Sequence, residues 1–179
     1  GSEMCIRDRK KGIHLKMEYD VKHEHVICDE TKNKEIFLNL ISNAVKYTAS
    51  GGTVTIRITE IDCDREDCVR IQTQVIDTGI GMSEEFLPSL FEAFARERNT
   101  TAGKVAGTGL GMPIIKKYVD MMGGSIEVQT EQGKGTEFIV RLPFRIQSGH
   151  QRIEKIAELE GLKALVVDDD FNTCDSVTK

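Results

Sequence analysis

The strongest constraint on the fold is one long amphipathic segment, residues 31–46, set between stretches with a different periodicity. Its apolar residues recur at the spacing of a helix, and they are Ile36, Phe37, Leu40, Ile41, Ala44 and Val45. Gly51 and Gly52 follow the segment and favour a helix end just before them. The sequence therefore predicts a long helix with one buried face, which must pack against another layer of structure.

Most of the flanking stretches predict strands, because their apolar residues alternate with a period of two. The predicted strands cover residues 13–19, 25–28, 53–59, 69–76, 125–129 and 136–142. A second helix is predicted over residues 110–122, and short helical pieces interrupted by Pro88 over residues 83–95. Strands and helices are grouped rather than strictly alternating. We therefore predict an α+β fold, a two-layer α/β sandwich whose mixed, mostly antiparallel sheet is covered by helices on one face.

The chain is expected to contain one complete domain and part of a second. Residues 1–12 begin with Gly-Ser and continue with charged residues, a pattern typical of a tag remnant and a leader without fold. Residues 13–146 carry the periodicity of the predicted domain, and residues 147–161 form a charged linker. Residues 162–179 begin with an apolar run that predicts one buried strand.

Composition and charge exclude several classes of function. The net charge of -5 at pH 7 and the scattered Lys and Arg residues argue against nucleic acid as a partner. Five cysteines without a CxxC pair indicate neither a disulfide framework nor a zinc site. Cys63 and Cys68 could meet across a hairpin, but reduced thiols are the favoured interpretation. Because no apolar run approaches the ~20 residues that a membrane helix needs, any membrane anchor is expected elsewhere.

One polar edge of the first predicted helix suits a metal ion with phosphate ligands. Asn39, Asn43, Lys46 and Tyr47 fall within about 100° of arc at 3.6 residues per turn, beside the apolar stripe. The amide oxygen of Asn43 suits Mg²⁺, which would take its remaining ligands from water and phosphates. Lys46 offers a point charge to the same phosphates. An ordinary solvated helix face is the alternative for this helix taken alone.

A carboxylate followed by two glycines comes directly after the predicted strand over residues 69–76. Gly79 and Gly81 allow tight turns after Asp77 and let a flat ring approach the main chain. A buried carboxylate must find hydrogen-bond donors, and the exocyclic amine of adenine is one such donor. Asp77 is therefore a candidate reader of a purine base, whereas a solvated aspartate in an ordinary turn is the alternative.

A glycine-rich segment, GTGLGM at residues 107–112, opens the second predicted helix. Free backbone N–H groups and the positive end of the helix dipole at that point suit an anion such as a phosphate. The GxGxG spacing matches neither the Rossmann fingerprint nor the Walker P-loop. The preceding polar residues 96–105 could close over a nucleotide, with Arg96 or Lys104 reaching the γ-phosphate. A plain surface loop is the alternative for these residues.

Four short segments in a fixed order resemble those of one known family. They are NLISNAVKYT at residues 39–48, DTGIGM at 77–82, FEAF at 91–94 and GTGLGM at 107–112. These segments look like the N, G1, F and G2 boxes of the histidine kinase catalytic domain, within the superfamily of gyrase, Hsp90, histidine kinases and MutL. The resemblance covers residues 13–146. It implies a Bergerat-type α/β sandwich that holds ATP and Mg²⁺ between its helices and a lid.

The resemblance also implies roles for residues at the matching motif positions. Asn43 would ligate Mg²⁺ and Lys46 would touch phosphate. Tyr47 would pack near the base, and Asp77 would bind the adenine amine. Arg96 would match the basic residue of the F box and complete a catalytic set with Asn43 and Lys46. The implied nucleotide-binding residues are Asn39, Asn43, Lys46, Tyr47, Asp77, Gly79, Gly81, Met82, Phe94, Gly107, Thr108, Gly109, Leu110 and Gly111.

Asn39 favours a kinase over a hydrolysing ATPase. The hydrolysing relatives carry a glutamate one helical turn before the metal-binding asparagine, where it activates water. Asn39 occupies that position here, and an amide cannot accept a proton at neutral pH. A gyrase-, Hsp90- or MutL-like ATPase and a non-catalytic interaction module of the same fold are the alternatives.

The phospho-accepting histidine is expected outside this chain. None of its histidines lies in a helical segment that resembles the family's H box, and they are His14, His23, His25 and His150. We therefore expect phosphotransfer to a histidine on a separate dimerisation domain, which the resemblance places upstream. This chain alone is expected not to phosphorylate itself on histidine.

The apolar run near the C-terminus resembles the first strand of a response-regulator receiver domain. It begins at Leu162 and ends in acidic residues, of which Asp168 and Asp169 would match the Mg²⁺-binding pair. A strand that ends in solvated aspartates is the alternative. The order of kinase domain, linker and receiver implies a hybrid histidine kinase. The expected partners are then ATP, the histidine-bearing domain and a receiver or response regulator, and the expected location is the cytoplasm.

Overall fold

The computed structural model describes residues 2–8, 12–23, 25–63, 65, 67–97 and 108–146, with residues 2–8 as backbone only. All of these residues fall within one compact unit, residues 1–148. The predicted linker and the predicted receiver strand lie outside the described residues, as does Gly107.

The predicted strands and the two predicted helices occur in the expected order, with bounds that differ by a few residues, and one further strand precedes them. The strands are β1 (Ser2–Asp8), β2 (Ile13–Asp20), β3 (Val26–Ile27), β4 (Thr53–Ile61), β5 (Cys68–Asp77), β6 (Ser125–Glu131) and β7 (Gly135–Ile146). The helices are α1 (Glu30–Tyr47), the short 3-10 helix η1 (Leu87–Ser89) and α2 (Gly111–Met121). Pro88 lies within η1. This three-residue helix is the whole helical content of residues 83–95, for which short helical pieces were predicted.

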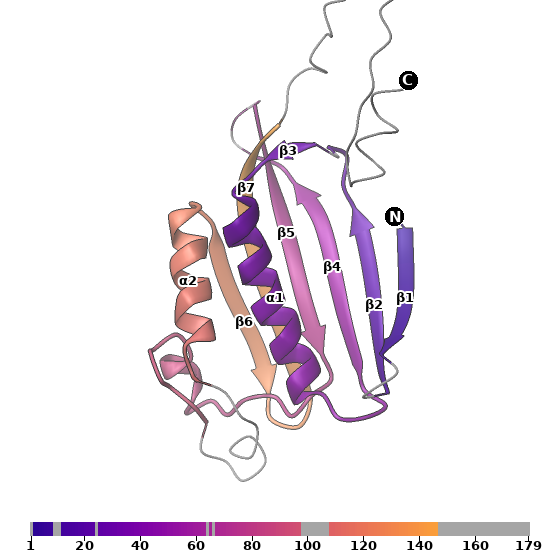
Figure 1. Cartoon of the computed structure of the whole chain (residues 1–179), viewed down its shortest axis with the longest axis vertical. Helices are drawn as coiled ribbons and strands as arrows, with labels where there is room; N and C mark the ends of the chain where they lie inside the picture. Colours follow the sequence, from indigo (N-terminus) through magenta and orange to yellow (C-terminus); the bar gives the residue numbers. More distant parts are fainter. Residues whose placement is uncertain are drawn as a thin grey trace, which may run out of the picture. The chain divides into compact units, whose positions relative to one another are not determined.

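The sheet is mixed and mostly antiparallel, which confirms the predicted fold class. Its strands follow the order β1-β2-β4-β5-β7-β3, and β6 also pairs with β7. Among the described strands, β2 and β4 form a parallel pair and the other pairs are antiparallel. Figure 1 shows α1 and α2 lying side by side on one face of this sheet. The arrangement is the two-layer α/β sandwich expected from the grouping of elements.

The core lies between the helices and the strands behind them. The apolar stripe of α1 buries Ile36, Leu40 and Ala44, and α2 buries Ile115 and Val119. These side chains pack against one face of the sheet, whose buried residues include Val54, Val75, Phe138, Val140, Leu142 and Phe144. The opposite face is mostly polar, with side chains such as Arg57, Gln72 and Arg141, although it also carries the buried Ile139.

The ends of α1 are fixed by hydrogen bonds. Asp29 caps the start, because its Oδ1 accepts from the Lys32 backbone N–H at 3.0 Å. At the other end the Thr48 N–H and the Thr48 hydroxyl both donate to the Ala44 carbonyl, at 3.1 and 2.7 Å. The Tyr47 carbonyl accepts from the Ile80 N–H, so the last turn of α1 lies beside the loop that follows β5 and Asp77.

Two expectations are corrected by the structure. Residues 2–8, expected to be a leader without fold, form β1 and pair antiparallel with β2 along its full length. Backbone pairing at a sheet edge needs little specific sequence, so a charged segment could take it up without an alternation signal. Cys63 and Cys68, expected as reduced thiols, form a disulfide with their Cα atoms 5.8 Å apart. The turn between β4 and β5 holds them at a separation that suits the bond.

The structure also bears on membrane association. Among the residues that it describes, neither α1 nor α2 is long and apolar enough to span a bilayer.

Candidate nucleotide-binding site

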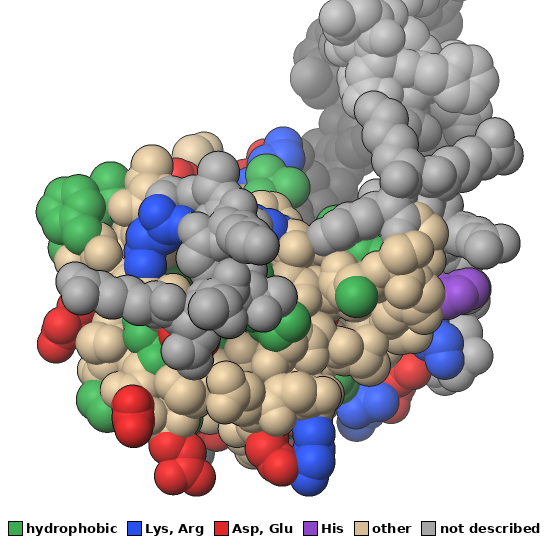
Figure 2. Space-filling model, turned by 90° about the horizontal axis from the view of Figure 1, so that it is seen from below, with side chains coloured by type: hydrophobic (Ala, Val, Ile, Leu, Met, Phe, Trp, Pro, Cys, Tyr) green, Lys and Arg blue, Asp and Glu red, His purple; other side chains and the backbone are tan. Residues whose placement is uncertain are grey.

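A cavity of about 280 Å³ lies at the end of the sheet where α1 finishes and α2 begins. Its walls come from the last turns of α1, the loop after β5, residues 86–97, the start of α2 and the first residues of β7. Figure 2 shows the molecule from this end, with acidic side chains along one edge. The cavity joins segments that are far apart in the sequence, so the predicted motifs meet in one place.

Asp77 is the buried carboxylate of the cavity. It is the last residue of β5 and is only 7% exposed. Its carboxylate accepts hydrogen bonds from the backbone N–H of Gly79, at 2.8 Å, and from that of Thr136. Burial raises the pKa of Asp77 above its ordinary value of 3.8, and these two hydrogen bonds only partly offset the effect. The carboxylate has capacity for a further donor, such as the exocyclic amine of a purine.

The loop after Asp77 packs directly against the end of α1. The Ile80 N–H donates to the Tyr47 carbonyl at 3.3 Å. A Cβ atom on Gly79 would approach that carbonyl oxygen to 2.6 Å, which explains why the smallest residue stands there. The close approach of two backbones fixes Asp77 relative to the polar residues of α1.

The polar edge of α1 faces the cavity as predicted from its spacing. Asn39, Asn43, Lys46 and Tyr47 all line it. The amide nitrogen of Asn43 donates to Met112 Sδ at 3.7 Å, which orients the side chain and turns its oxygen away from the sulfur. Lys46 Nζ lies 5.1 Å from the centre of the Tyr47 ring, within the range of a cation–π contact.

The start of α2 supplies backbone donors to the same cavity. Gly111 and Met112 line it, and the Ile114 N–H makes the bond of the first turn with the Leu110 carbonyl. The N–H groups of Gly111 and Met112 precede the regular helix bonds and lie at the positive end of the helix dipole, whereas Pro113 has no N–H. This arrangement suits the phosphates of a nucleotide.

The sequence matches the family model "Histidine kinase-, DNA gyrase B-, and HSP90-like ATPase" over residues 28–146. This chain belongs to that family. Among curated relatives it is 36% identical over 169 residues to the autoinducer 2 sensor kinase/phosphatase LuxQ of Vibrio parahaemolyticus, a match that covers 89% of this chain and 20% of the relative. It is 41% identical over 118 residues to the sensory/regulatory protein RpfC of Xanthomonas campestris, covering 66% of this chain and 16% of the relative. The chain thus spans about a fifth of the length of the curated relatives it matches.

Solved structures of histidine kinases have the same fold. The mycobacterial sensor histidine kinase MprB matches with a TM-score of 0.59 and 29% identity, over 74% of this chain and 83% of that one. Full-length ShkA in complex with AMPPNP also matches with a TM-score of 0.59 and 29% identity, over 78% of this chain and 27% of that one. The prediction of a histidine kinase catalytic domain from four short motifs is confirmed.

The family domain brings most of the predicted site residues to the cavity. Those that line it are Asn39, Asn43, Lys46, Tyr47, Asp77, Gly81, Met82, Arg96, Thr108, Gly109 and Gly111. Gly79 acts one step back, through its hydrogen bond to Asp77. Leu110 is the residue before α2 and is not among the cavity-lining residues.

Phe94 is the remaining described site residue that does not line the cavity. Phe94 is 73% exposed, has a φ of 64° and lies outside the cavity lining, although its N–H donates to the Gly109 carbonyl at 3.0 Å. This hydrogen bond ties the F box to the glycine-rich segment through backbone, so the side chain is left to point outward. Asp168 and Asp169 lie outside the described residues.

Several cavity residues were missed by the sequence analysis. Thr136 and Phe138 line the cavity from β7, and Met112 lines it from α2. The signal for Thr136 was present in the alternation of β7, because Thr136 pairs with Asp77 and its side chain therefore lies on the same face of the sheet. Pairing partners cannot be assigned from one sequence alone, so this signal could not be used.

The donor set fits a magnesium ion that arrives with a nucleotide. Among the described residues there is no group of three His, Cys, Asp or Glu side chains that could hold a metal by itself. Asn43 offers one amide oxygen beside the start of α2, whose backbone donors suit an anion. Mg²⁺ is commonly bound by one or two protein oxygens plus substrate phosphates and water, and the Asn43 oxygen fits the part of the protein ligand.

Proposed function

We propose that this domain binds Mg-ATP and donates the γ-phosphoryl group to a histidine on a separate domain, as in two-component signalling. The observation that carries the proposal is the meeting of Asp77, Asn43 and the start of α2 in one cavity. Asp77 would accept a hydrogen bond from the adenine amine, and the start of α2 would receive the phosphates. The likeness to sensor kinases by sequence and to an AMPPNP complex by structure supports the same nucleotide.

The residues of the cavity would act by positioning and by neutralising charge. Asn43 would ligate the magnesium ion, whose charge lowers the cost of bringing the nucleophile to the phosphates. Lys46 and Arg96 would approach the phosphate oxygens, and Tyr47 would pack against the nucleotide. The step breaks the bond from the γ-phosphorus to the β–γ bridging oxygen and joins the phosphorus to a histidine ring nitrogen. ADP leaves, and the imidazole releases a proton.

Asn39 supports transfer to a partner rather than hydrolysis. Its amide nitrogen donates to the Glu35 carbonyl at 2.9 Å, and it lies one turn before Asn43 on the same edge of α1. An amide at this position cannot take a proton from water. The kinase proposal therefore needs a nucleophile that is already reactive, which a histidine imidazole provides.

The direct test mixes this domain, labelled ATP and the separately expressed histidine-bearing domain of the same full-length protein. We expect acid-labile label on the histidine domain and none on this chain alone. The Asn43→Ala variant should slow the transfer at least about tenfold through loss of the metal ligand, whereas Ser42→Ala, on the exposed face of α1, should not. Multiple turnovers of phosphate release without transfer would contradict the kinase proposal and favour the ATPase.

The same proposal extends to the expected partners. A hybrid kinase would pass the phosphoryl group onward to a receiver domain, for which Asp168 and Asp169 are the sequence evidence. Both the histidine partner and the receiver would then work in the cytoplasm, where ATP is supplied.

A further inference from the structure

The turn between β6 and β7 lies against the loop that carries Asp77. The Gly133 N–H donates to the Ile80 carbonyl at 2.7 Å. Gly81 has a φ of 63°, and a Cβ atom on it would overlap the Glu131 carbonyl. Gly135 is packed as closely against the carbonyl of Asp77. The loop is therefore held between the end of α1 on one side and this turn on the other.

One hydroxyl group joins the two segments. Thr130 Oγ1 accepts from the Met82 backbone N–H at 2.9 Å. It also lies 3.0 Å from the Gly135 carbonyl, to which it donates, and 3.1 Å from Thr136 Oγ1, which can donate to it. A hydroxyl has one proton and two lone pairs, so these three contacts use its whole capacity.

The partners of Thr130 are cavity residues, whereas Thr130 is not. Met82 and Thr136 both line the cavity, and Thr136 also donates its backbone N–H to Asp77. Thr130 pairs with Thr136 across β6 and β7, so the two hydroxyls lie on the same face of the sheet. The hydroxyl of Thr130 thereby fixes the far end of the Asp77 loop and the orientation of Thr136 together.

We propose that Thr130 is a positioning residue for recognition of the nucleotide base, acting through the Met82 backbone and the Thr136 hydroxyl. The inference rests on the proposed binding of ATP. It assigns a functional role to β6, which supplies none of the cavity-lining residues. Because the contacts lie at the Asp77 end of the cavity, the effect concerns the base rather than the phosphates.

The test compares three ligands and four proteins by calorimetric titration. ADP, GDP and inorganic tripolyphosphate are titrated into the unaltered protein and into Thr130→Val, Thr130→Ser and Thr55→Val. Valine keeps the shape of threonine and removes the hydroxyl, which leaves the Met82 N–H without this acceptor. Thr55→Val makes the same change on β4, outside the cavity lining. Thermal unfolding of each variant checks that the fold is kept.

We expect Thr130→Val to bind ADP about tenfold more weakly, because the partly buried hydrogen bonds of the hydroxyl to Met82 and Thr136 are lost, with tripolyphosphate affinity unchanged. The preference of Thr130→Val for ADP over GDP, expressed as the ratio of the two affinities, should fall by the same factor. Thr130→Ser should restore ADP affinity to within about twofold, because serine keeps the hydroxyl. Without ligand, hydrogen exchange of the Met82 amide should be about tenfold faster in Thr130→Val than in Thr55→Val.

Equal ADP affinity in Thr130→Val and the unaltered protein would overturn the inference and leave the proposed function standing. An equal loss for all three ligands would also overturn it, because the effect would then be a general loosening of the fold. If the unaltered protein binds no ADP, the proposed function fails, and the inference that rests on it fails too.

Discussion

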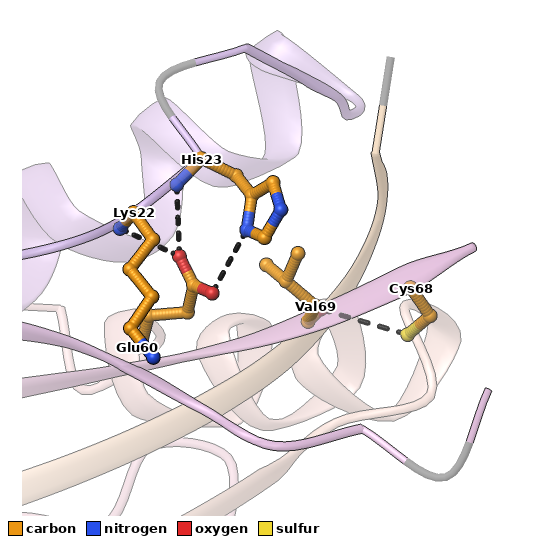
Figure 3. A network of polar contacts seen from close by, with 5 residues as sticks. All are labelled: Lys22, His23, Glu60, Cys68 and Val69. Carbon is orange, nitrogen blue, oxygen red and sulfur yellow. Dashed lines mark hydrogen bonds and ion pairs between the residues drawn. The ribbon is translucent and has the colours of Figure 1, made fainter. Parts of the chain in front are cut away.

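Two carboxylates at opposite ends of the β4–β5 hairpin have opposite environments. Glu60, near the turn, accepts from the backbone N–H groups of Lys22 and His23 at 2.8 and 2.9 Å, and it bonds the His23 ring nitrogen at 2.8 Å (Figure 3). Burial raises the pKa of Glu60, but these hydrogen bonds outweigh it, so the pKa is lowered from its ordinary value of 4.5. Asp77, at the far end, has two backbone donors, and its pKa is raised.

The difference separates a structural carboxylate from one that is prepared for a ligand. Glu60 has donors on both oxygens, so its charge is stabilised by the protein alone. Asp77 is buried with too few donors to offset the cost, and it faces a cavity. A ligand that brings a donor to Asp77 would supply the missing hydrogen bond. Such under-compensated groups in cavities are typical of functional sites.

Asp77→Asn should have the largest effect on binding. The substitution keeps the shape but removes the charge that would accept the adenine amine. We expect ADP affinity to fall roughly 100-fold, the range for a hydrogen bond to a charged group. Calorimetric titration measures this, with Asp120→Asn on the exposed side of α2 as the matched control. A change of less than about threefold in Asp77→Asn would show that the raised pKa has no connection with the ligand.

Gly81→Ala tests whether the frame around Asp77 is as rigid as its contacts indicate. A side chain there would overlap the Glu131 carbonyl in a backbone conformation that alanine disfavours. We expect the free energy of unfolding to fall by about 2 kcal/mol. Gly133→Ala is the matched control, because Gly133 has a φ of 82° but nothing within 4 Å of its Cβ position. Gly133→Ala should lower the free energy of unfolding by about 1 kcal/mol, from backbone strain alone, as measured by denaturant unfolding. Equal losses in the two variants would mean that the β6–β7 turn moves to accommodate the new side chain at position 81.

The fold was largely predictable from periodicity because its main elements are long. The buried stripe of α1 and the alternation in β4 and β5 gave elements within a few residues of those observed. Their ends were less predictable. β7 continues past Leu142 to Ile146, because Pro143 pairs with Arg70 and the following residues continue the ladder. Such extension depends on the partner strand, which the local sequence does not contain.

A site residue was predictable where the sequence next to it determines its position in the fold. Asp77 follows a strand and precedes two glycines, so its position at a strand end was evident from local sequence. The role of Thr130 was not, since it depends on the register of β6 with β7 and on the packing of a loop some fifty residues earlier. Phe94 shows the reverse case, where a motif residue is held by its backbone and its side chain points outward.

The pH dependence of binding should report the raised pKa of Asp77. A carboxyl whose folded pKa is raised binds its proton more readily in the folded than in the unfolded chain. Its contribution to stability therefore grows as pH falls through the window above 3.8. ADP affinity should move the other way, because only the ionised form accepts the amine. The loss of ADP affinity on protonation of Asp77 cannot exceed the loss caused by Asp77→Asn. Titrations of ADP from pH 8 to 5 measure it. The Asp77→Asn variant should lack this pH-dependent loss. If ADP affinity changed with pH in the same way in the unaltered protein and in Asp77→Asn, Asp77 would not be the group that accepts the adenine amine.

Glu60→Gln should have the smallest effect. The amide keeps an acceptor for the backbone of Lys22 and His23 but loses the charge, and His23 is partly exposed, so water screens the interaction. We expect a loss of less than about 1 kcal/mol in unfolding free energy at pH 7. Because the pKa of Glu60 is lowered, this difference should vanish as pH falls through the lowered value, below 4.5.

Glu18→Gln, which breaks the Glu18–Arg57 pair on the polar face of the sheet, is the matched control for the stability change. Neither variant should alter ADP affinity, since neither residue lines the cavity. If Glu60→Gln weakened ADP binding while Glu18→Gln did not, the β4–β5 hairpin would couple its two ends. The carboxylate at the turn would then have to be counted as part of the nucleotide site, and the division between the two ends would fail.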